Sequence, residues 1–183
     1  TTPFMTKMMA TNLELYQAGE GVTAAGVFYS AGSKYSIISG PFGAGWFSPT
    51  GSGITMGLII AVMLFSKRDD FKAIAKLAIP CGIFNINEPI IFGIPMVMNA
   101  MFAVPFFLAP IACVCCGYLV QSLGLCPLFI IDVPWTTPVG LFGFLASSGN
   151  IMGAIWQAVI ILGVSTLIYT PFVIAANRQE AEA

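Results

Sequence analysis

The chain has 183 residues, of which 57% are hydrophobic and only 8% carry a charge. A soluble domain needs more polar surface than this composition supplies, so a lipid bilayer is the expected solvent. The net charge of −1 offers no basic patch for nucleic acid. With no histidine, and with five cysteines outside any paired C-x-x-C arrangement, the sequence predicts no metal site, no disulfide framework and no cofactor.

Residues 1–50 are expected to form an amphipathic and connecting region. One face of a first helix is predicted by apolar residues at helical spacing, namely Met8, Met9, Leu13 and Tyr16. The stretch from Gly19 to Pro49 is rich in glycine and serine and has the aromatic pair Trp46 and Phe47 near its end. This pattern is typical of a long connection that ends at a membrane interface.

Residues 51–176 are predicted to form a transmembrane domain that begins with an apolar run from Gly51 to Ser66. A charge cluster follows at once, formed by Lys67, Arg68, Asp69, Asp70, Lys72 and Lys76. The positive-inside rule places this cluster in the cytoplasm. A solvated loop is the simpler interpretation of the cluster, and a docking site is the alternative.

The apolar stretch from Leu77 to Ala100 is interrupted by Pro80, Gly82, Pro89, Gly93 and Pro95. An interior proline removes a helical hydrogen bond and clashes with the preceding turn, so one continuous helix is not expected. Two half-helices that meet between Asn85 and Glu88 fit better. Because lipid tolerates such backbone only inside protein or beside a polar cavity, the sequence predicts a re-entrant hairpin near residues 77–100.

The remaining elements complete an all-α integral membrane fold with two re-entrant helical hairpins. A span is predicted from Met101 to Leu123, with kinks at its two prolines. Residues 126–148 repeat the interrupted pattern and are expected to form the second hairpin. A last span runs from Ile151 to Ala176, and residues 177–183 form a cytoplasmic tail on the same side as the charge cluster.

Only two charged residues, Glu88 and Asp132, lie between Lys76 and Arg178. Because Pro89 favours the first turn of a helix, Glu88 should sit at the positive end of a half-helix dipole. This partly offsets the cost of about 2.5–3.5 kcal/mol for an acidic group at mid-membrane. Paired interruptions of apolar segments also indicate a transporter's binding site.

Each candidate residue also has a purely structural interpretation. Glu88 could only cap its helix, although the neighbouring Asn85 and Asn87 add polar groups that all need partners, which favours a ligand site. Asp132, just before Val133 and a proline, could simply fix a turn. Trp135 could be a binding platform or a residue of the interfacial aromatic belt.

Two strings of residues resemble a known family. Residues 84–95 read FNINEPIIFGIP, and residues 133–138 read VPWTTP, with GFLA following at 143–146. Both are similar to motifs of the sugar-translocating IIC components of bacterial phosphotransferase systems for lactose, cellobiose and chitobiose. The resemblance extends from about Thr50 to Pro171.

This resemblance implies a sugar permease in the bacterial plasma (inner) membrane, multi-pass and homodimeric, in contact with lipid. A disaccharide would bind between the hairpins and present its C6 hydroxyl to a phosphocysteine of the cytosolic IIB protein, itself charged by IIA. The resemblance assigns Glu88 a catalytic position beside that hydroxyl and Asn87 a sugar contact. The candidate substrate-binding residues are Asn85, Asn87, Glu88, Asp132, Trp135 and Thr136.

Two departures from the family's pattern accompany the resemblance. A histidine upstream of the hairpins normally contributes to the sugar site, and this chain has none. The family's first spanning helices are also absent, and the chain begins at Thr1, so we expect a piece of a longer permease or a truncated gene product.

Other function classes stay open, and so does the sugar. An ion-coupled secondary transporter would also use broken helices and a buried acid, and an inactive permease fragment is a third possibility. No phosphate-binding loop, nucleophile–histidine pair or dinucleotide fingerprint favours a soluble enzyme. The phosphoryl group would come from IIB rather than from this chain, and lactose, cellobiose and diacetylchitobiose are all candidate substrates.

Overall fold

The computed structural model describes residues 3–23, 26–94, 96 and 100–181. Over these residues the chain forms helices and no strand, apart from an isolated bridge between Thr23 and Gly26, which confirms the predicted all-α class. The helical elements are α1 (Pro3–Gln17), α2 (Gly40–Trp46), α3 (Met56–Phe65), α4 (Asp69–Ile83), α5 (Glu88–Gly93), α6 (Ala100–Ser122), α7 (Leu141–Ala146), α8 (Ile151–Ala158), the π-helix η1 (Val159–Val164) and α9 (Ser165–Ala181).

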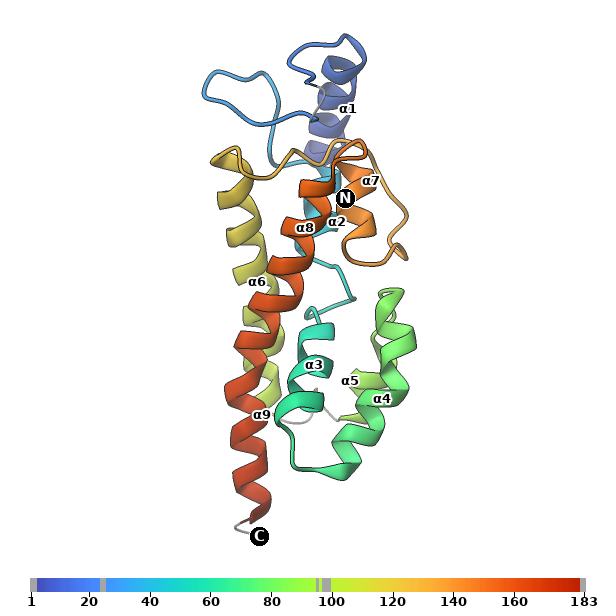
Figure 1. Cartoon of the computed structure of the whole chain (residues 1–183), viewed down its shortest axis with the longest axis vertical. Coiled ribbons are helices and arrows are strands. Elements are labelled where there is room, and N and C mark those ends of the chain that lie inside the picture. Colours follow the sequence, from blue (N-terminus) through green and yellow to red (C-terminus); the bar gives the residue numbers. More distant parts are fainter. Residues whose placement is uncertain (1–2, 24–25, 95, 97–99, 182–183) are drawn as a thin grey trace.

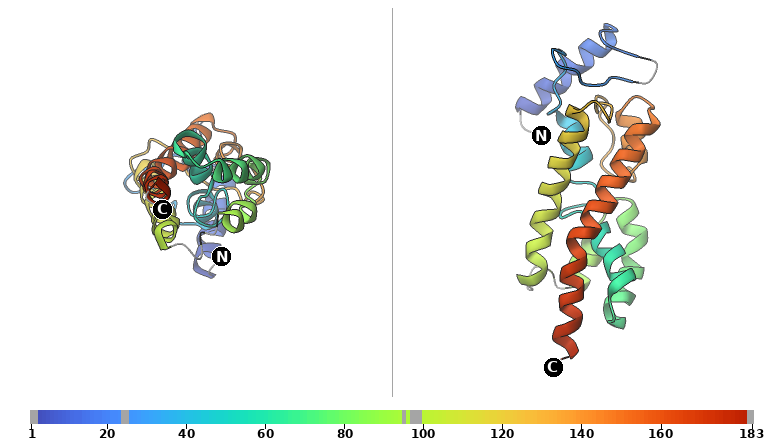
Figure 2. Two further views of the ribbon diagram at one scale, coloured as in Figure 1. Left: turned by 90° about the horizontal axis from the view of Figure 1, so that it is seen from below. Right: turned by 60° about the vertical axis from the view of Figure 1, so that its left-hand side comes forward.

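Two long helical rods run along the molecule, α6 and the continuous α8–η1–α9 (Figure 1). Figure 2 shows the same arrangement from a second side. The stretches Met101–Ser122 and Ile151–Arg178 are long and apolar enough to cross a membrane, in agreement with the predicted spans. Large apolar side chains such as Phe107 and Leu167 are 69% and 74% exposed on these rods, as lipid contact would require.

The predicted span from Gly51 to Ser66 is helical only from Met56. Four residues before it have positive φ angles, namely Thr50, Gly51, Gly53 and Ile54. The two glycines are required there, because a Cβ on Gly51 would lie 2.4 Å from Asn87 Cγ and one on Gly53 would lie 2.3 Å from a Phe106 ring carbon. The helix therefore begins five residues later than the apolar run suggests.

The predicted half-helices of the segment 77–100 are present within its described residues, while Pro95 and residues 97–99 lie outside the described part of the chain. α4 ends at Ile83, after which Asn85 takes a left-handed conformation with φ 65°. α5 begins at Glu88 with Pro89 in its first turn. The two helices pack against each other, and α4 also packs on α3. Their turn lies near the middle of the molecule (Figure 1).

The segment 126–148 departs from the predicted helical hairpin, because only its second arm contains a helix, α7. The first arm is non-helical, and its backbone N–H groups bond outside the arm: Leu128 donates to Val27 O (2.8 Å), and Ile130 donates to Ala146 O in the second arm (2.8 Å). Pro127 and Pro134 have no N–H, so neither can donate a backbone hydrogen bond within this arm.

The first fifty residues contain more structure than a connection. α1 matches the predicted helix, although Leu13 of the expected apolar face is exposed and Asn12 is the buried residue. The short helix α2 was not predicted. Trp46, expected at a membrane interface, is instead fully buried and stacks on Phe129 with ring centroids 5.2 Å apart. It fits because Gly117 presents no side chain to it.

The buried apolar residues form two separate cores. The upper core, at the top in Figure 1, lies among α2, residues 126–133, α7 and η1 and contains Trp46 and Phe142. The lower core lies among α3, α4, α5, α9 and the first half of α6 and contains Phe102 and Tyr169. The level between the two cores is where the candidate site is found.

The charge cluster and the end of α9 lie at the same end of the molecule, as predicted. Asn177 of α9 joins them, because its Oδ1 accepts a hydrogen bond from Lys67 N–H (2.9 Å) and its Nδ2 donates to Phe65 O (2.8 Å). Within the cluster, Arg68 pairs with Asp70 (2.5 Å) and covers the Phe71 ring. The pKa of Asp70 is lowered by its hydrogen bond to Arg68.

Candidate functional site

Three non-helical segments meet midway along the molecule, between the two cores. They are the turn before α3 at 50–52, the α4–α5 turn at 84–87, and the loop 135–137 that precedes α7. In Figure 1 the α4–α5 turn rises toward this level from the lower half, and the loop before α7 descends to it from the upper half. Hydrogen bonds from two asparagines join the three segments.

Asn85 makes the central connection. Its side-chain Oδ1 accepts a hydrogen bond from Thr50 N–H (2.7 Å), and its Nδ2 donates to Trp135 O and to Thr137 O, the latter at 3.0 Å. The residue is buried, and its left-handed backbone aims the amide out of the turn. Each polar atom of the side chain therefore has a backbone partner, as burial requires.

Asn87 makes the second connection, from the N-cap position of α5. Its Nδ2 donates to Ser52 O (2.7 Å), and its side chain is buried against Gly51. Unlike Asn85, it has an amide oxygen with no hydrogen-bond partner among the described residues. That oxygen can accept one bond from a bound hydroxyl group.

Asn85 and Asn87, with the backbone groups that they bind, form a buried frame. The other predicted site residues are exposed around it. Glu88 directly follows Asn87 and is exposed, with no ion pair among the residues that the structure describes. Trp135 is 67% exposed, and Thr136 beside it is also exposed. The frame thus fixes a carboxylate on one segment and an aromatic ring with a hydroxyl group on another, all accessible to a ligand.

Asp132 is not brought into the same network. It is exposed on the first arm of the second interrupted segment, and no described hydrogen bond links it to the α4–α5 turn. Asn85 instead contacts the backbone three and five residues further on, at Trp135 and Thr137. The hydrogen bonds of Asn85 and Asn87 therefore bring together the segments that carry five of the six predicted residues. Asp132 lies outside this network.

Sequence reasoning missed the residues that support the frame. Thr50 and Ser52 supply backbone groups to the two asparagines. Gln157 on α8 is fully buried; its Oε1 accepts from Gly140 N–H (2.9 Å) and Gly143 N–H (2.8 Å), and its Nε2 donates to Gly45 O (3.0 Å). A lone glutamine in an apolar span was a usable signal, since such groups need internal partners.

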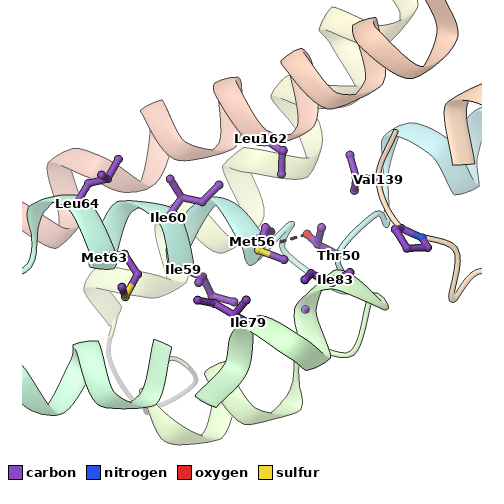
Figure 3. Close-up of a pocket in the computed structure, with 12 residues that line it drawn as sticks. Thr50, Met56, Ile59, Ile60, Met63, Leu64, Ile79, Ile83, Val139 and Leu162 are labelled. Carbon is purple, nitrogen blue, oxygen red and sulfur yellow. Dashed lines mark hydrogen bonds between the residues drawn. The ribbon is translucent and has the colours of Figure 1, made fainter. Parts of the chain in front are cut away.

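A groove of about 500 Å³ adjoins the meeting point of the three segments, between α3, α4 and the loop after Thr137 (Figure 3). Its walls are almost entirely apolar, with Ile59, Ile79, Val139 and Leu162 among them. A sugar requires hydrogen-bonding groups that these side chains lack. The side chains of the groove therefore offer a sugar few partners, although Thr50 belongs both to the groove and to the meeting point.

Comparison with known proteins identifies this architecture. The family described as phosphotransferase system, EIIC, matches residues 1–110. A cellobiose-specific EIIC component of Lactococcus lactis subsp. lactis is 43% identical over 74% of this chain and 27% of that protein. A lactose-specific EIICB component of Staphylococcus aureus is 35% identical over 88% of the chain and 26% of that protein.

A solved structure agrees with these sequence matches. The transporter ChbC, the IIC component of an N,N'-diacetylchitobiose-specific phosphotransferase system, superimposes with a TM-score of 0.81 at 32% identity, over 96% of this chain and 38% of that one. The class is thus that of helical sugar-transport proteins of the membrane. The chain belongs to the phosphotransferase-system EIIC family of sugar permeases, and it spans about a third of the length of these relatives.

Proposed function

We propose that the chain binds and translocates a disaccharide, which is phosphorylated by a cytosolic IIB partner on arrival. The observation that carries this proposal is the exposed Glu88, held on a buried asparagine frame next to the segment that bears Trp135. The names of the similar proteins specify cellobiose, lactose and N,N'-diacetylchitobiose, all β-linked disaccharides. A sugar of this class is the proposed substrate.

Each site residue has a proposed role that its environment allows. Glu88 accepts the proton of the hydroxyl that attacks the phosphoryl group, or orients that oxygen. Trp135 packs its ring on the apolar face of a pyranose, and Thr136 and Asp132 bond to sugar hydroxyls. Asn87 accepts a hydroxyl hydrogen bond with its free Oδ1. Asn85 acts on the sugar indirectly, by holding the two segments together.

The proposed setting is the bacterial inner membrane. α4–α5 and the segment 126–148 are proposed as re-entrant hairpins of a homodimer, with the charge cluster and the end of α9 in the cytoplasm. IIB would approach from that side, supplied by IIA. The lactose-specific relative is described as an EIICB component, a name that combines IIC and IIB. This combination supports a IIB partner for the present chain.

Family membership favours phosphoryl coupling over ion coupling. The two mechanisms are separated by the energy source of uptake in cells that produce the permease. Uptake of cellobiose should stop when the phosphoryl-donor chain is removed and should persist when an uncoupler collapses the ion gradients. The opposite result would assign the chain to ion-coupled transport.

The site is tested with the purified protein in detergent, by measuring binding of cellobiose, lactose and diacetylchitobiose. Glu88→Gln should weaken binding of one of these sugars about tenfold, because a charge-assisted hydrogen bond becomes a neutral one. IIB-dependent phosphorylation of that sugar should fall by about 100-fold or more, the usual contribution of a general base.

Glu20→Gln is the matched control. Glu20 lies in the loop after α1, where it pairs with Lys34 (2.8 Å) and lines a second pocket, separate from the apolar groove. This variant should bind and be active like the parent. Equal effects of the two substitutions, or unchanged phosphorylation with Glu88→Gln, would contradict the proposed site.

A further inference from the structure

The apolar groove runs from the candidate site toward the charge cluster. Thr50 and Val139 line it next to the meeting point of the three segments, and Met63 and Leu64 line its other end (Figure 3). From Met56 to Leu64 helix α3 rises about 12 Å, close to the roughly 15 Å that one leaflet contributes to the hydrocarbon core of a bilayer. The groove therefore has the polarity and the length that suit the acyl chain of a lipid.

The end of the groove at Leu64 lies at the boundary of the membrane. The apolar stretch of the last rod ends at Arg178. Directly before it, Asn177 accepts a hydrogen bond from Lys67 N–H (2.9 Å) and donates one to Phe65 O (2.8 Å), so α3 and the rod end at the same level. Lipid headgroups begin where the apolar stretch ends. A lipid in the groove would therefore have its headgroup beside the charge cluster.

Helix α4 continues the wall of the groove with two lysines. Ile79 and Ile83 line the groove. Lys76 and Lys72 precede Ile79 by three and seven residues, a spacing that places them on the same face of the helix. Lys76 is exposed and Lys72 is half-buried. One face of α4 thus changes from apolar to cationic along the groove.

The packing of α4 on α3 places these lysines at the level of the headgroups. The two helices run in opposite directions (Figure 1), and a Cβ on Gly82 would lie 3.0 Å from Met56 Cε and 3.2 Å from Ile59 Cδ1. Lys76 is six residues nearer the start of α4 than Gly82, so it is level with Leu64 at the end of the groove. The other lysine lies one turn further toward the cluster.

The charge cluster has an excess of positive charge at this end. It contains four basic and two acidic residues, and Arg68 is paired with Asp70. The ammonium groups of Lys72 and Lys76 have no ion pair among the residues that the structure describes. Asp69 lies on the same face of α4, one turn beyond the lysines, so it does not stand between them and the groove. An anionic group at the end of the groove would meet two cations.

We propose that the groove binds one anionic phospholipid, with an acyl chain between α3 and α4 and its phosphate at Lys72 and Lys76. Basic pockets between membrane helices on the cytoplasmic side bind anionic headgroups in this way. A zwitterionic lipid could fill the groove equally well but offers the lysines no net negative charge. The inner end of the chain packs beside Thr50, whose N–H binds Asn85, so the lipid also supports the buried frame. This inference goes beyond the proposed sugar transport and does not depend on it.

The proposal is tested by capturing the lipid in place. A photoreactive diazirine amino acid is encoded at Leu64, at the outer end of the groove, or at Ile83, nearer the candidate site. Leu167 of α9, which does not line the groove, is the reference position, and all three residues are exposed. The full chain is placed in nanodiscs with equal amounts of phosphatidylglycerol and phosphatidylcholine that have the same acyl chains. After irradiation, mass spectrometry identifies the lipid adducts.

Adducts with phosphatidylglycerol should exceed those with phosphatidylcholine about fivefold or more at Leu64 and at Ile83, because each lysine near an anionic lipid contributes a preference of about fivefold. At Leu167 the two lipids should be captured within about twofold of each other. This comparison uses the parent protein and needs no charge variant.

The role of the lysines is tested with Lys72→Gln combined with Lys76→Gln. This double variant should reduce the preference at both groove positions to the value at Leu167, and the two Lys→Arg changes should retain it. Lys7→Gln combined with Lys34→Gln is the matched control: it removes the same charge at the other end of the molecule, where α1 and its following loop lie (Figure 1), and should leave the preference unchanged.

Equal capture of the two lipids at Leu64 would overturn the proposal, and so would a preference that survives the loss of both lysines. A preference at Leu64 with no lipid adduct at Ile83 would overturn it as well, because the lysines would then attract lipid only to the surface. An adduct with the mass of a second copy of the chain would place protein in the groove and exclude the lipid. No sugar is added, so the outcome is separate from that of the sugar-binding experiment.

Discussion

The two interrupted segments of the chain contain similar numbers of prolines and glycines but fold in different ways. Residues 77–93 contain the end of α4 and the helix α5, which satisfy most of their own hydrogen bonds; α4 packs on α3, and α5 packs on α4. Residues 126–148 form a non-helical arm and one short helix. The arm bonds to Ala146 O at the end of that helix and to Val27 O, and Gln157 of α8 accepts from two N–H groups near the helix.

The difference follows from the spacing of the prolines. α4 has fifteen residues, begins with Asp69 and Asp70 at the favourable end of its dipole, and tolerates one proline near its end. In the second segment Pro127, Pro134 and Pro138 fall within twelve residues, and the run before α7 is non-helical. A non-helical arm cannot pair its backbone groups with each other, so it depends on partners further away in the sequence. The second segment should therefore be more sensitive to distant substitutions than the first.

The largest expected effect is that of Trp46→Ala. Trp46 is fully buried and stacks on Phe129 of the second segment, so the truncation leaves a cavity that costs about 3 kcal/mol of unfolding free energy. Trp46→Phe should cost much less, because the ring contact remains and Trp46 Nε1 has no hydrogen-bond partner among the described residues. Unfolding in mixed detergent micelles measures both, and equal losses would show that the stacked packing contributes little.

A somewhat smaller effect is expected for Gln157→Leu. This change leaves two backbone N–H groups near α7 and the carbonyl of Gly45 without partners, at a cost of about 3 kcal/mol or less. Gln121→Leu is the matched control, because Gln121 is equally buried but makes one hydrogen bond, to Pro127 O (3.0 Å). It should cost about 1 kcal/mol. Hydrogen exchange should show the loss from Gln157→Leu concentrated in residues 139–147, and a uniform loss would contradict this role of Gln157.

The contrast between the segments also explains what the sequence could predict. Apolar length predicted α6 and the last rod, and the position of Pro89 predicted the turn before α5, because these features are determined locally. The non-helical arm before α7, the burial of Trp46 and the helix α2 depend on contacts between segments far apart. Local patterns do not contain those contacts.

The same distinction applies to the site. The sequence identified Glu88 and the two asparagines, since polar groups stand out in an apolar stretch. It did not separate their environments: Asn85 is bonded at every polar atom, whereas Glu88 is exposed. That difference depends on Thr50, Ser52 and the loop before α7, and it changes Asn85 from a predicted sugar contact to a proposed positioning residue.

The smallest expected effect concerns the contact of the first segment with the turn before α3. Gly51 has φ 80°, and a Cβ there would lie 2.4 Å from Asn87 Cγ, so Gly51→Ala should displace Asn87 from Ser52. We expect a loss of about 2 kcal/mol, half from backbone strain and half from the displaced side chain.

Gly19→Ala separates these two contributions. Gly19 has a similar φ of 74° but nothing within 4 Å of an added Cβ, so it should show only the strain, about 1 kcal/mol. Sugar binding should weaken in Gly51→Ala and not in Gly19→Ala, because only Gly51 supports the residue next to Glu88. Equal stability losses with equal sugar binding would mean that Asn87 tolerates displacement from Ser52.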